Sequence, residues 1–121
     1  MGGVAEIHLS RVYDRDPRRP GRRYLVERLW PRGVRRDQLD VDDWLKDVAP
    51  SDDLRRWFGH RPERWAEFRR RYQAELDAHP DALRPLLDAA EAGPVTLLYS
   101  SRDREHNNAV ALRDYLLGKL R

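Results

Sequence analysis

The chain contains no cysteine, and this absence excludes disulfides, thiolate catalysis and cysteine-ligated metal. It has no run of about 18 apolar residues either, so the sequence predicts no membrane-spanning helix. Its first residues lack the basic start and the apolar stretch of a secretion signal. At 121 residues the chain is long enough for one domain with a single core, and we expect it to be cytoplasmic.

Lysine is scarce, and all but two of the 24 cationic residues are arginine. A GC-rich genome produces the same bias without any functional meaning. The net charge of +3 conceals three blocks, since residues 11–36 carry +7, residues 37–54 carry −6 and residues 55–72 carry +5. Blocks of opposite sign can neutralise one another in the folded chain, so we interpret them first as solvated, salt-bridged faces.

Three segments have the residue pattern of strands: residues 6–13, residues 24–30 and residues 95–99. The last of these is apolar and uncharged, which is typical of a central strand covered on both faces. Between the second and third strands lies an acidic segment, residues 37–49, in which we expect a helical turn around residues 42–47. The segment from residue 14 to residue 23 is rich in proline and arginine and reads as a loop.

Three consecutive helices are predicted after the acidic segment. The first is capped by Ser51 and stops at Gly59. The second begins at Pro62 and ends at Pro80. Its helical spacing gives one apolar stripe, Trp65, Phe68, Tyr72 and Leu76. Together with Trp57 of the first helix, the aromatic members of this stripe are expected to be mostly buried. The third helix is closed by Gly93-Pro94, and Pro85 must lie in its first turn.

A fourth helix, residues 106–117, is expected to pack on the sheet. The resulting order predicts an α/β fold: a single small domain with a short, mostly parallel sheet covered by helices. The long helical insertion falls between the second and the last strands. It would act as one right-handed crossover, which places residues 95–99 beside residues 24–29 in parallel.

One string, Leu25-Val26-Glu27-Arg28-Leu29-Trp30-Pro31-Arg32-Gly33, is the most specific in the chain. Shorter strings accompany it: Arg11-Val12-Tyr13-Asp14, Pro50-Ser51, Leu54-Arg55, Trp57-Phe58, Thr96-Leu97-Leu98-Tyr99-Ser100, Asn107 and Ala109. Together, from about residue 7 to residue 120, they resemble the YeaO-like branch of domain-of-unknown-function family 488. The resemblance implies this fold and a site near the long string, but no established activity. Longer members of the wider family carry a Cys-His-Arg cluster after the last strand. This chain has Ser100, His106 and Asn107 there, so thiol chemistry is not implied.

Polar side chains gather where the second and last predicted strands end. The carboxyl ends of parallel strands meet at one edge of a sheet, and ligands of open α/β sheets bind there. We therefore expect one concave site formed by Glu27, Arg28, Trp30, Arg32, Tyr99, Ser100, Ser101, His106 and Asn107. Glu27 would be a base or a ligand anchor, and Arg28 with Arg32 would clamp a phosphate or carboxylate bidentately. The structural alternative is an ion-pair network in which Glu27 contacts Arg55 or Arg11.

The loop from Ser100 to Asn108 leads into a helix N-terminus, which favours an anion. It contains no glycine, so it cannot close on phosphates as a phosphate-binding loop does. A serine nucleophile with His106 as its base is an alternative, but no Gly-x-Ser-x-Gly elbow supports it. Ligand contact or helix capping by His106 and Asn107 is favoured. The four histidines show no ligand spacing, so neither a metal nor a cofactor is expected.

Three functions fit these observations. The leading one is binding of a small anionic molecule, phosphate- or carboxylate-bearing, at the strand edge, with catalysis left open. The second is nucleic-acid binding by residues 15–23 together with Arg32, Arg35 and Arg36. The third is a non-catalytic interaction protein.

Overall fold

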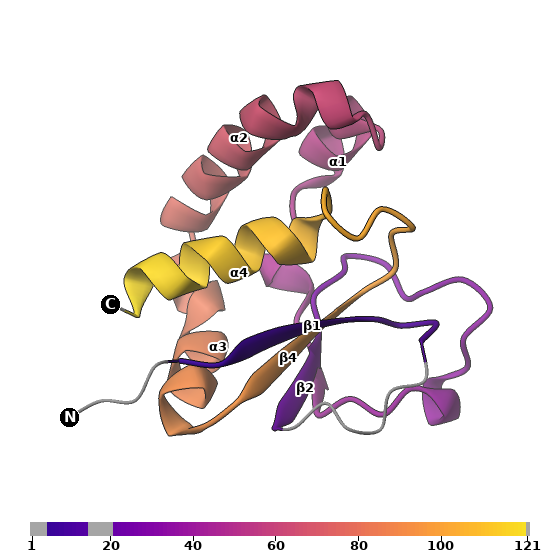
Figure 1. Ribbon diagram of the computed structural model, residues 1–121, viewed down its shortest axis with the longest axis vertical. Helices are drawn as coiled ribbons and strands as arrows, with labels where there is room; N and C mark the ends of the chain where they lie inside the picture. Colours follow the sequence, from indigo (N-terminus) through magenta and orange to yellow (C-terminus); the bar gives the residue numbers. More distant parts are fainter. Residues whose placement is uncertain (1–4, 15–20, 121) are drawn as a thin grey trace.

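The structure, a computed structural model, describes residues 5–14 and 21–120. Its centre is a four-stranded sheet in the order β1-β4-β2-β3, with every neighbouring pair parallel (Figure 1). The strands are β1 (Ile7–Arg11), β2 (Arg22–Leu25), β3 (Asp43–Trp44) and β4 (Val95–Tyr99). Leu25 lies opposite Leu98 of β4 and Trp44 of β3. The parallel pairing of the second predicted strand with residues 95–99 is therefore confirmed, as is the α/β fold class.

Four α-helices pack on one face of this sheet: α1 (Asp52–Phe58), α2 (Trp65–Asp77), α3 (Pro80–Ala92) and α4 (Asn108–Lys119). Short 3-10 turns lie between these elements: η1 (Arg36–Gln38), η2 (Lys46–Val48) and η3 (Pro62–Arg64). The Ser51 hydroxyl caps α1 by accepting a hydrogen bond from the Leu54 amide at 3.2 Å. Gly59 ends the helix in the left-handed region with φ of 54°. In the described ranges, no helix has the length and apolarity to cross a bilayer.

The two faces of the sheet are covered differently. All four helices contribute to one core cluster, which contains Val95 and Leu97 of β4. On the other face Leu25 and Leu98 are buried beneath partly buried side chains of the loop after β2. These side chains are Trp30, Leu39, Val41 and Trp44. The strand β4 is thus buried on both faces as predicted, but a loop rather than a helix covers the second face. Figure 1 shows this loop at the right of the sheet, apart from the helices.

The acidic segment does not form the predicted helical turn. Residues 43–44 form β3 instead, and only residues 46–48 form a helical turn. The Asp42 and Leu45 amides donate hydrogen bonds to β2 carbonyls, at 2.7 Å to Arg23 and 2.9 Å to Leu25. Pairing with the free edge of β2 therefore overrides the local preference. β2 itself ends at Leu25, earlier than residue 30, because the following residues turn out to form the site described below.

Two further expectations need correction. Pro80 begins α3, and Pro85 lies in its sixth position rather than its first turn. Pro85 is exposed there, so water can hydrogen-bond the helix carbonyl that a proline leaves without a partner. Trp57 and Trp65 are only partly buried, whereas Phe68 and Tyr72 are buried as predicted. One reason is that charged side chains share the indole surface: the Arg71 guanidinium lies 4.2 Å from the centroid of the Trp57 ring.

Gly21 is required by a close approach of two chain segments. Its φ is 84°, and a Cβ built there would lie 1.9 Å from the carbonyl oxygen of Pro94. That oxygen accepts a hydrogen bond from the Arg22 amide, so it cannot retreat freely. We expect Gly21→Ala to lower the free energy of unfolding by about 3 kcal/mol in chemical denaturation. Gly118→Ala is the matched control, because Gly118 is an exposed α4 residue with open space around it, and this variant should gain about 0.5–1 kcal/mol. Equal effects of the two substitutions would contradict this account.

Phe68 joins α1 and α2 through its ring. Its centroid lies 4.5 Å from that of Phe58 and 5.7 Å from that of Tyr72, and its side chain is only 2% exposed. We expect Phe68→Ala to cost about 3–5 kcal/mol of unfolding free energy, the range for emptying a packed aromatic site. A loss below about 1 kcal/mol would show that the site collapses around the missing ring.

Candidate functional site

A cavity of about 410 Å³ opens at the carboxyl edge of the sheet. Its walls come from the loop after β2, the start and end of α1, and the loop between β4 and α4. The lining residues are Tyr13, residues 27–32, residues 49–50, residues 55–56, residues 58–60, Phe68, Ser100, Ser101 and residues 106–108. Eight of the nine predicted ligand residues line this cavity. Tyr99 does not, because as the last residue of β4 it belongs to the core cluster on the helical face and is 3% exposed.

The Glu27 carboxylate joins the loop after β2 to the loop after β4. Its Oε1 atom accepts hydrogen bonds from the Ser100 amide at 2.8 Å and from the Ser100 hydroxyl at 3.2 Å. Burial raises the pKa of this carboxyl, and the Ser100 hydrogen bonds and the charge of Arg55 offset only part of that effect. Arg11, the other expected partner, donates instead to the Ser101 carbonyl at 2.9 Å. Glu27 therefore makes a structural contact, as the alternative to a catalytic role predicts. Its hydrogen-bond partner, however, is Ser100 rather than Arg55 or Arg11.

Arg28 holds the segment that precedes α1. Its Nε and Nη2 atoms donate to the carbonyls of Pro50 and Ala49 at 3.1 and 3.0 Å. The guanidinium also lines a second cavity of about 510 Å³ on its far side, so it forms the wall between the two cavities. Two main-chain carbonyls already occupy part of its donor set. Its participation in an anion clamp stays a prediction.

Two further side chains fix the main chain after β2. The Asn108 side-chain amide donates to the Val26 carbonyl at 2.7 Å, which attaches the first residue of α4 to the sheet edge. The Trp44 indole donates to the Glu27 carbonyl at 2.6 Å from the opposite side. The position of the Glu27 carboxylate is therefore set by contacts that come from β3 and α4 as well as from β4.

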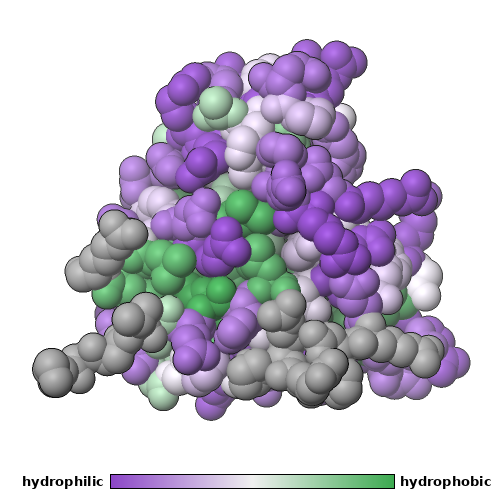
Figure 2. Space-filling view, viewed as in Figure 1, coloured by the Kyte–Doolittle hydropathy of each residue, from purple (hydrophilic) through white to green (hydrophobic). Residues whose placement is uncertain are grey.

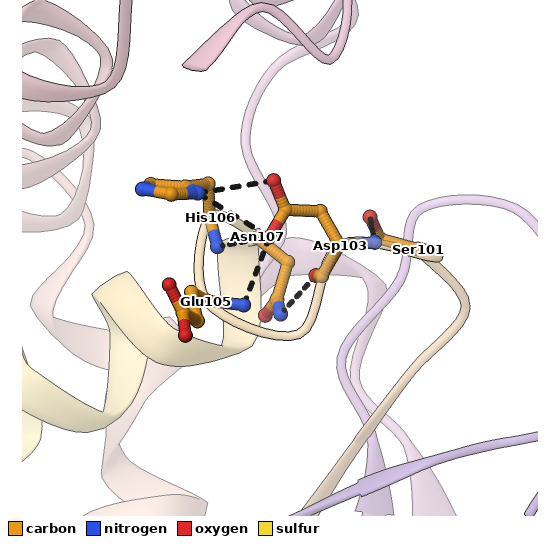
Figure 3. A network of polar contacts seen from close by, with 5 residues as sticks. All are labelled: Ser101, Asp103, Glu105, His106 and Asn107. Carbon is orange, nitrogen blue, oxygen red and sulfur yellow. Dashed lines mark hydrogen bonds and ion pairs between the residues drawn. The ribbon is translucent and has the colours of Figure 1, made fainter.

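The loop before α4 is organised around the Asp103 carboxylate (Figure 3). Its Oδ1 accepts from the amides of Glu105 and His106, both at 2.9 Å, and its Oδ2 lies 3.0 Å from Nδ1 of His106. Burial alone would raise the pKa of Asp103, but these amides and the imidazole together lower it. Asn107 donates to the Asp103 carbonyl at 2.9 Å and caps α4. Since Nδ1 of His106 faces Asp103, Nε2 is the ring nitrogen left for a ligand.

The predicted pairing of a serine nucleophile with His106 as its base does not form in this arrangement. The Ser100 hydroxyl lies beside Glu27, and the Ser101 hydroxyl accepts from the Asp103 amide at 3.1 Å. Among the described residues no hydrogen bond joins His106 to either serine. The same ranges contain no group of three His, Cys, Asp or Glu side chains that could hold a metal.

Sequence reasoning did not assign the basic residues in and after α1 to the binding site. Arg55, Arg56 and His60 line the cavity, whereas the sequence analysis named only Arg55, as a possible structural partner of Glu27. Gly59 and His60 both have positive φ, 54° and 57°, which turns the chain back toward the cavity after α1. Figure 2 shows hydrophilic side chains dominating the surface over α1 and α2 at the top of the view.

These cations are poorly matched by anions. Within the described ranges Arg32 and Arg56 have no ion-pair partner, and Arg55 has only Asp52 at 3.5 Å. Among the described residues, Glu27 is the single acidic side chain that lines the cavity, and its Oε1 atom already accepts two hydrogen bonds from Ser100. The cavity therefore presents an excess of positive charge.

Of the arginines named for the nucleic-acid alternative, Arg32 lines the cavity, and Arg35 and Arg36 make other contacts. Residues 15–20 of the arginine-rich loop lie outside the described residues. The Arg36 guanidinium lies 4.5 Å from the ring centroid of Trp30 and 4.9 Å from that of Trp44. Arg35 pairs with Asp37 at 3.3 Å. Both arginines thus take part in the loop that covers the second face of the sheet.

Comparison of the sequence with known proteins assigns this small α/β domain to a family. It belongs to the inactive DUF488-N3 subclade, whose family model matches residues 6–121. It is 42% identical over 110 residues to the uncharacterized protein YeaO of Escherichia coli K12, covering 91% of this chain and 96% of YeaO. It is 41% identical over 117 residues to the uncharacterized proteins Rv3073c of Mycobacterium tuberculosis H37Rv and Mb3100c of Mycobacterium bovis, covering 93% of this chain and 95% of each. No solved structure matches the chain. The resemblance to YeaO-like proteins is confirmed.

Glu27 should make stability depend on pH. Because its pKa is raised in the folded protein, its contribution is fully present below the ordinary pKa of 4.5 and is lost as the pH rises through the folded-state pKa. Glu27→Gln keeps an acceptor oxygen for the Ser100 amide and removes the titrating charge. We expect the wild type to lose stability relative to this variant as the pH rises above about 4, measured by denaturant unfolding. Glu63→Gln in η3 controls for the loss of one exposed negative charge, and a wild-type difference from Glu27→Gln that does not change with pH would refute the expectation.

Proposed function

We propose that this protein binds a small molecule bearing a phosphate or carboxylate group in the cavity at the carboxyl edge of the sheet, without covalent chemistry. The observation that carries the proposal is the excess of cations in one small cavity. Arg32, Arg55 and Arg56 line it with few or no described ion-pair partners, and Glu27, the one acidic lining residue in the described part of the chain, is already hydrogen-bonded. Guanidinium groups bind oxyanions bidentately, which suits this arrangement.

Two further features support an anion at this place. The helix α4 has twelve residues and begins at the cavity, so the positive end of its dipole lies there. His106 is held by Asp103 through Nδ1, which leaves its Nε2 atom for a contact with a ligand. The helix dipole adds to the positive potential that the arginines create.

Binding without chemistry is the simplest function for these side chains. His106 does not serve as the base of a serine nucleophile, because the described hydroxyls of Ser100 and Ser101 have hydrogen bonds to the Glu27 carboxylate and the Asp103 amide instead. The matching subclade of the family is itself described as inactive. We therefore assign Glu27 and Asp103 to holding the cavity walls and the free arginines to holding the ligand.

Inorganic phosphate should raise the melting temperature of the wild type relative to chloride at the same ionic strength. At ten times its Kd, a ligand stabilises by about 1.4 kcal/mol, which is several degrees for a domain of this size. Arg32→Ala and Arg56→Ala should each reduce this shift by at least half in differential scanning fluorimetry. Neither should change the melting temperature in chloride by more than about 2 °C, because both side chains are exposed.

Arg84→Ala is the matched control, since Arg84 is exposed on α3 and lines neither cavity. It removes the same charge from the protein and should keep the full phosphate shift. The proposal fails if wild-type melting ignores phosphate, sulfate and small carboxylates alike. It also fails if all three arginine variants reduce the shift equally, because a diffuse charge effect would then explain it.

A further inference from the structure

We propose that the natural ligand is a phosphate ester of an aromatic or heteroaromatic ring, and that the ring lies against Leu29 and Tyr13. This inference rests on the anion binding proposed above and specifies the rest of the molecule. Leu29 and Tyr13 are 63% and 44% exposed, and they are the only large hydrophobic residues exposed in the described part of the chain. Both line the cavity that contains the unpaired arginines.

Leu29 and Tyr13 lie at the same cavity, and this shared location is the evidence for an apolar part of the site. A single exposed leucine or tyrosine needs no explanation, because every protein surface contains apolar atoms. Here the two exposed large side chains come from different segments, the loop after β1 and the loop after β2, and meet at one cavity. An apolar wall next to unpaired cations fits a ligand with one apolar and one anionic part.

Tyr13 is directly connected to the cationic side of the cavity. Its hydroxyl donates to the Arg32 carbonyl at 2.8 Å. The Tyr13 side chain therefore contacts the main chain of an arginine that we propose to bind the anion. The Arg11 guanidinium lies 4.7 Å from the centroid of the Tyr13 ring and covers one of its faces. The other face can then receive a planar group. Aromatic rings stack in this way with a gain beyond their buried area.

The size of the cavity also argues for more than a bare oxyanion. Its volume of about 410 Å³ is in the range of small-molecule sites, which run from about 300 to about 1,000 Å³. Inorganic phosphate alone would leave Leu29 in contact with water. A ring attached to the phosphate would cover that side chain and would gain the free energy of burying apolar surface.

The test compares phenyl phosphate with methyl phosphate by isothermal titration calorimetry at constant ionic strength. The two esters carry the same anionic group, so their ratio reports the apolar part of the site alone. We expect the wild type to bind phenyl phosphate about tenfold more tightly, which corresponds to about 1.4 kcal/mol. Leu29→Ser should reduce the preference to about twofold or less while leaving the Kd for methyl phosphate unchanged, because Leu29 makes no contact with the anion.

Leu29→Phe is the conservative variant and should keep the full preference for the phenyl ester. Equal affinity of the wild type for the two esters would overturn this inference and leave the anion-binding proposal intact. A phenyl preference that Leu29→Ser does not alter would overturn the placement of the ring. If neither ester nor inorganic phosphate binds, the proposed function fails and this inference fails with it.

Discussion

The walls of the cavity depend on one carboxylate, that of Glu27, which accepts the amide and the hydroxyl of Ser100. This contact joins the ends of two neighbouring parallel strands at the point where their loops would otherwise separate. Burying a carboxylate is costly, and the raised pKa of Glu27 records that cost. The Trp44 indole and the Asn108 amide hold the adjoining main chain, so the position of the carboxylate is set from both sides of the sheet.

Glu27 and Arg28 are held by contacts within the protein. Charged residues at the end of an apolar strand draw attention as catalytic or binding groups, and these two are the most conspicuous examples. A buried or half-buried charge needs hydrogen-bond partners, and the structure provides them for both side chains. Exposed arginines such as Arg32 and Arg56 need no partner to be tolerated. Arg32 belongs to the most specific string of the sequence, whereas nothing in the sequence places Arg56 at this site.

The sequence was sufficient for the features that local chemistry determines. The uncharged strand β4, the Ser51 cap and the stripe through Phe68 and Tyr72 follow from residue types at fixed spacings. The strand β3 could not be predicted, because Asp42 and Asp43 disfavour strands and only the free edge of β2 makes one there. For the same reason the cations of α1 were missed. Their place at the cavity depends on how α1 packs and how its C-terminal turn bends, and the spacing of these residues in the sequence predicts neither.

The cavity is costly to maintain when it is empty. Like charges that share a small space repel one another, and Leu29 is exposed beside them to water. A structural ion-pair network would have placed carboxylates among Arg32, Arg55 and Arg56, as α2 does where Glu67 binds Arg70 and Arg71. Here the nearest lining carboxylate is bonded to Ser100 instead. A ligand with an oxyanion would relieve the repulsion among the arginines, and a ring attached to it would cover Leu29. The charge repulsion and the exposed leucine therefore both favour a ligand that carries an anionic group and a ring.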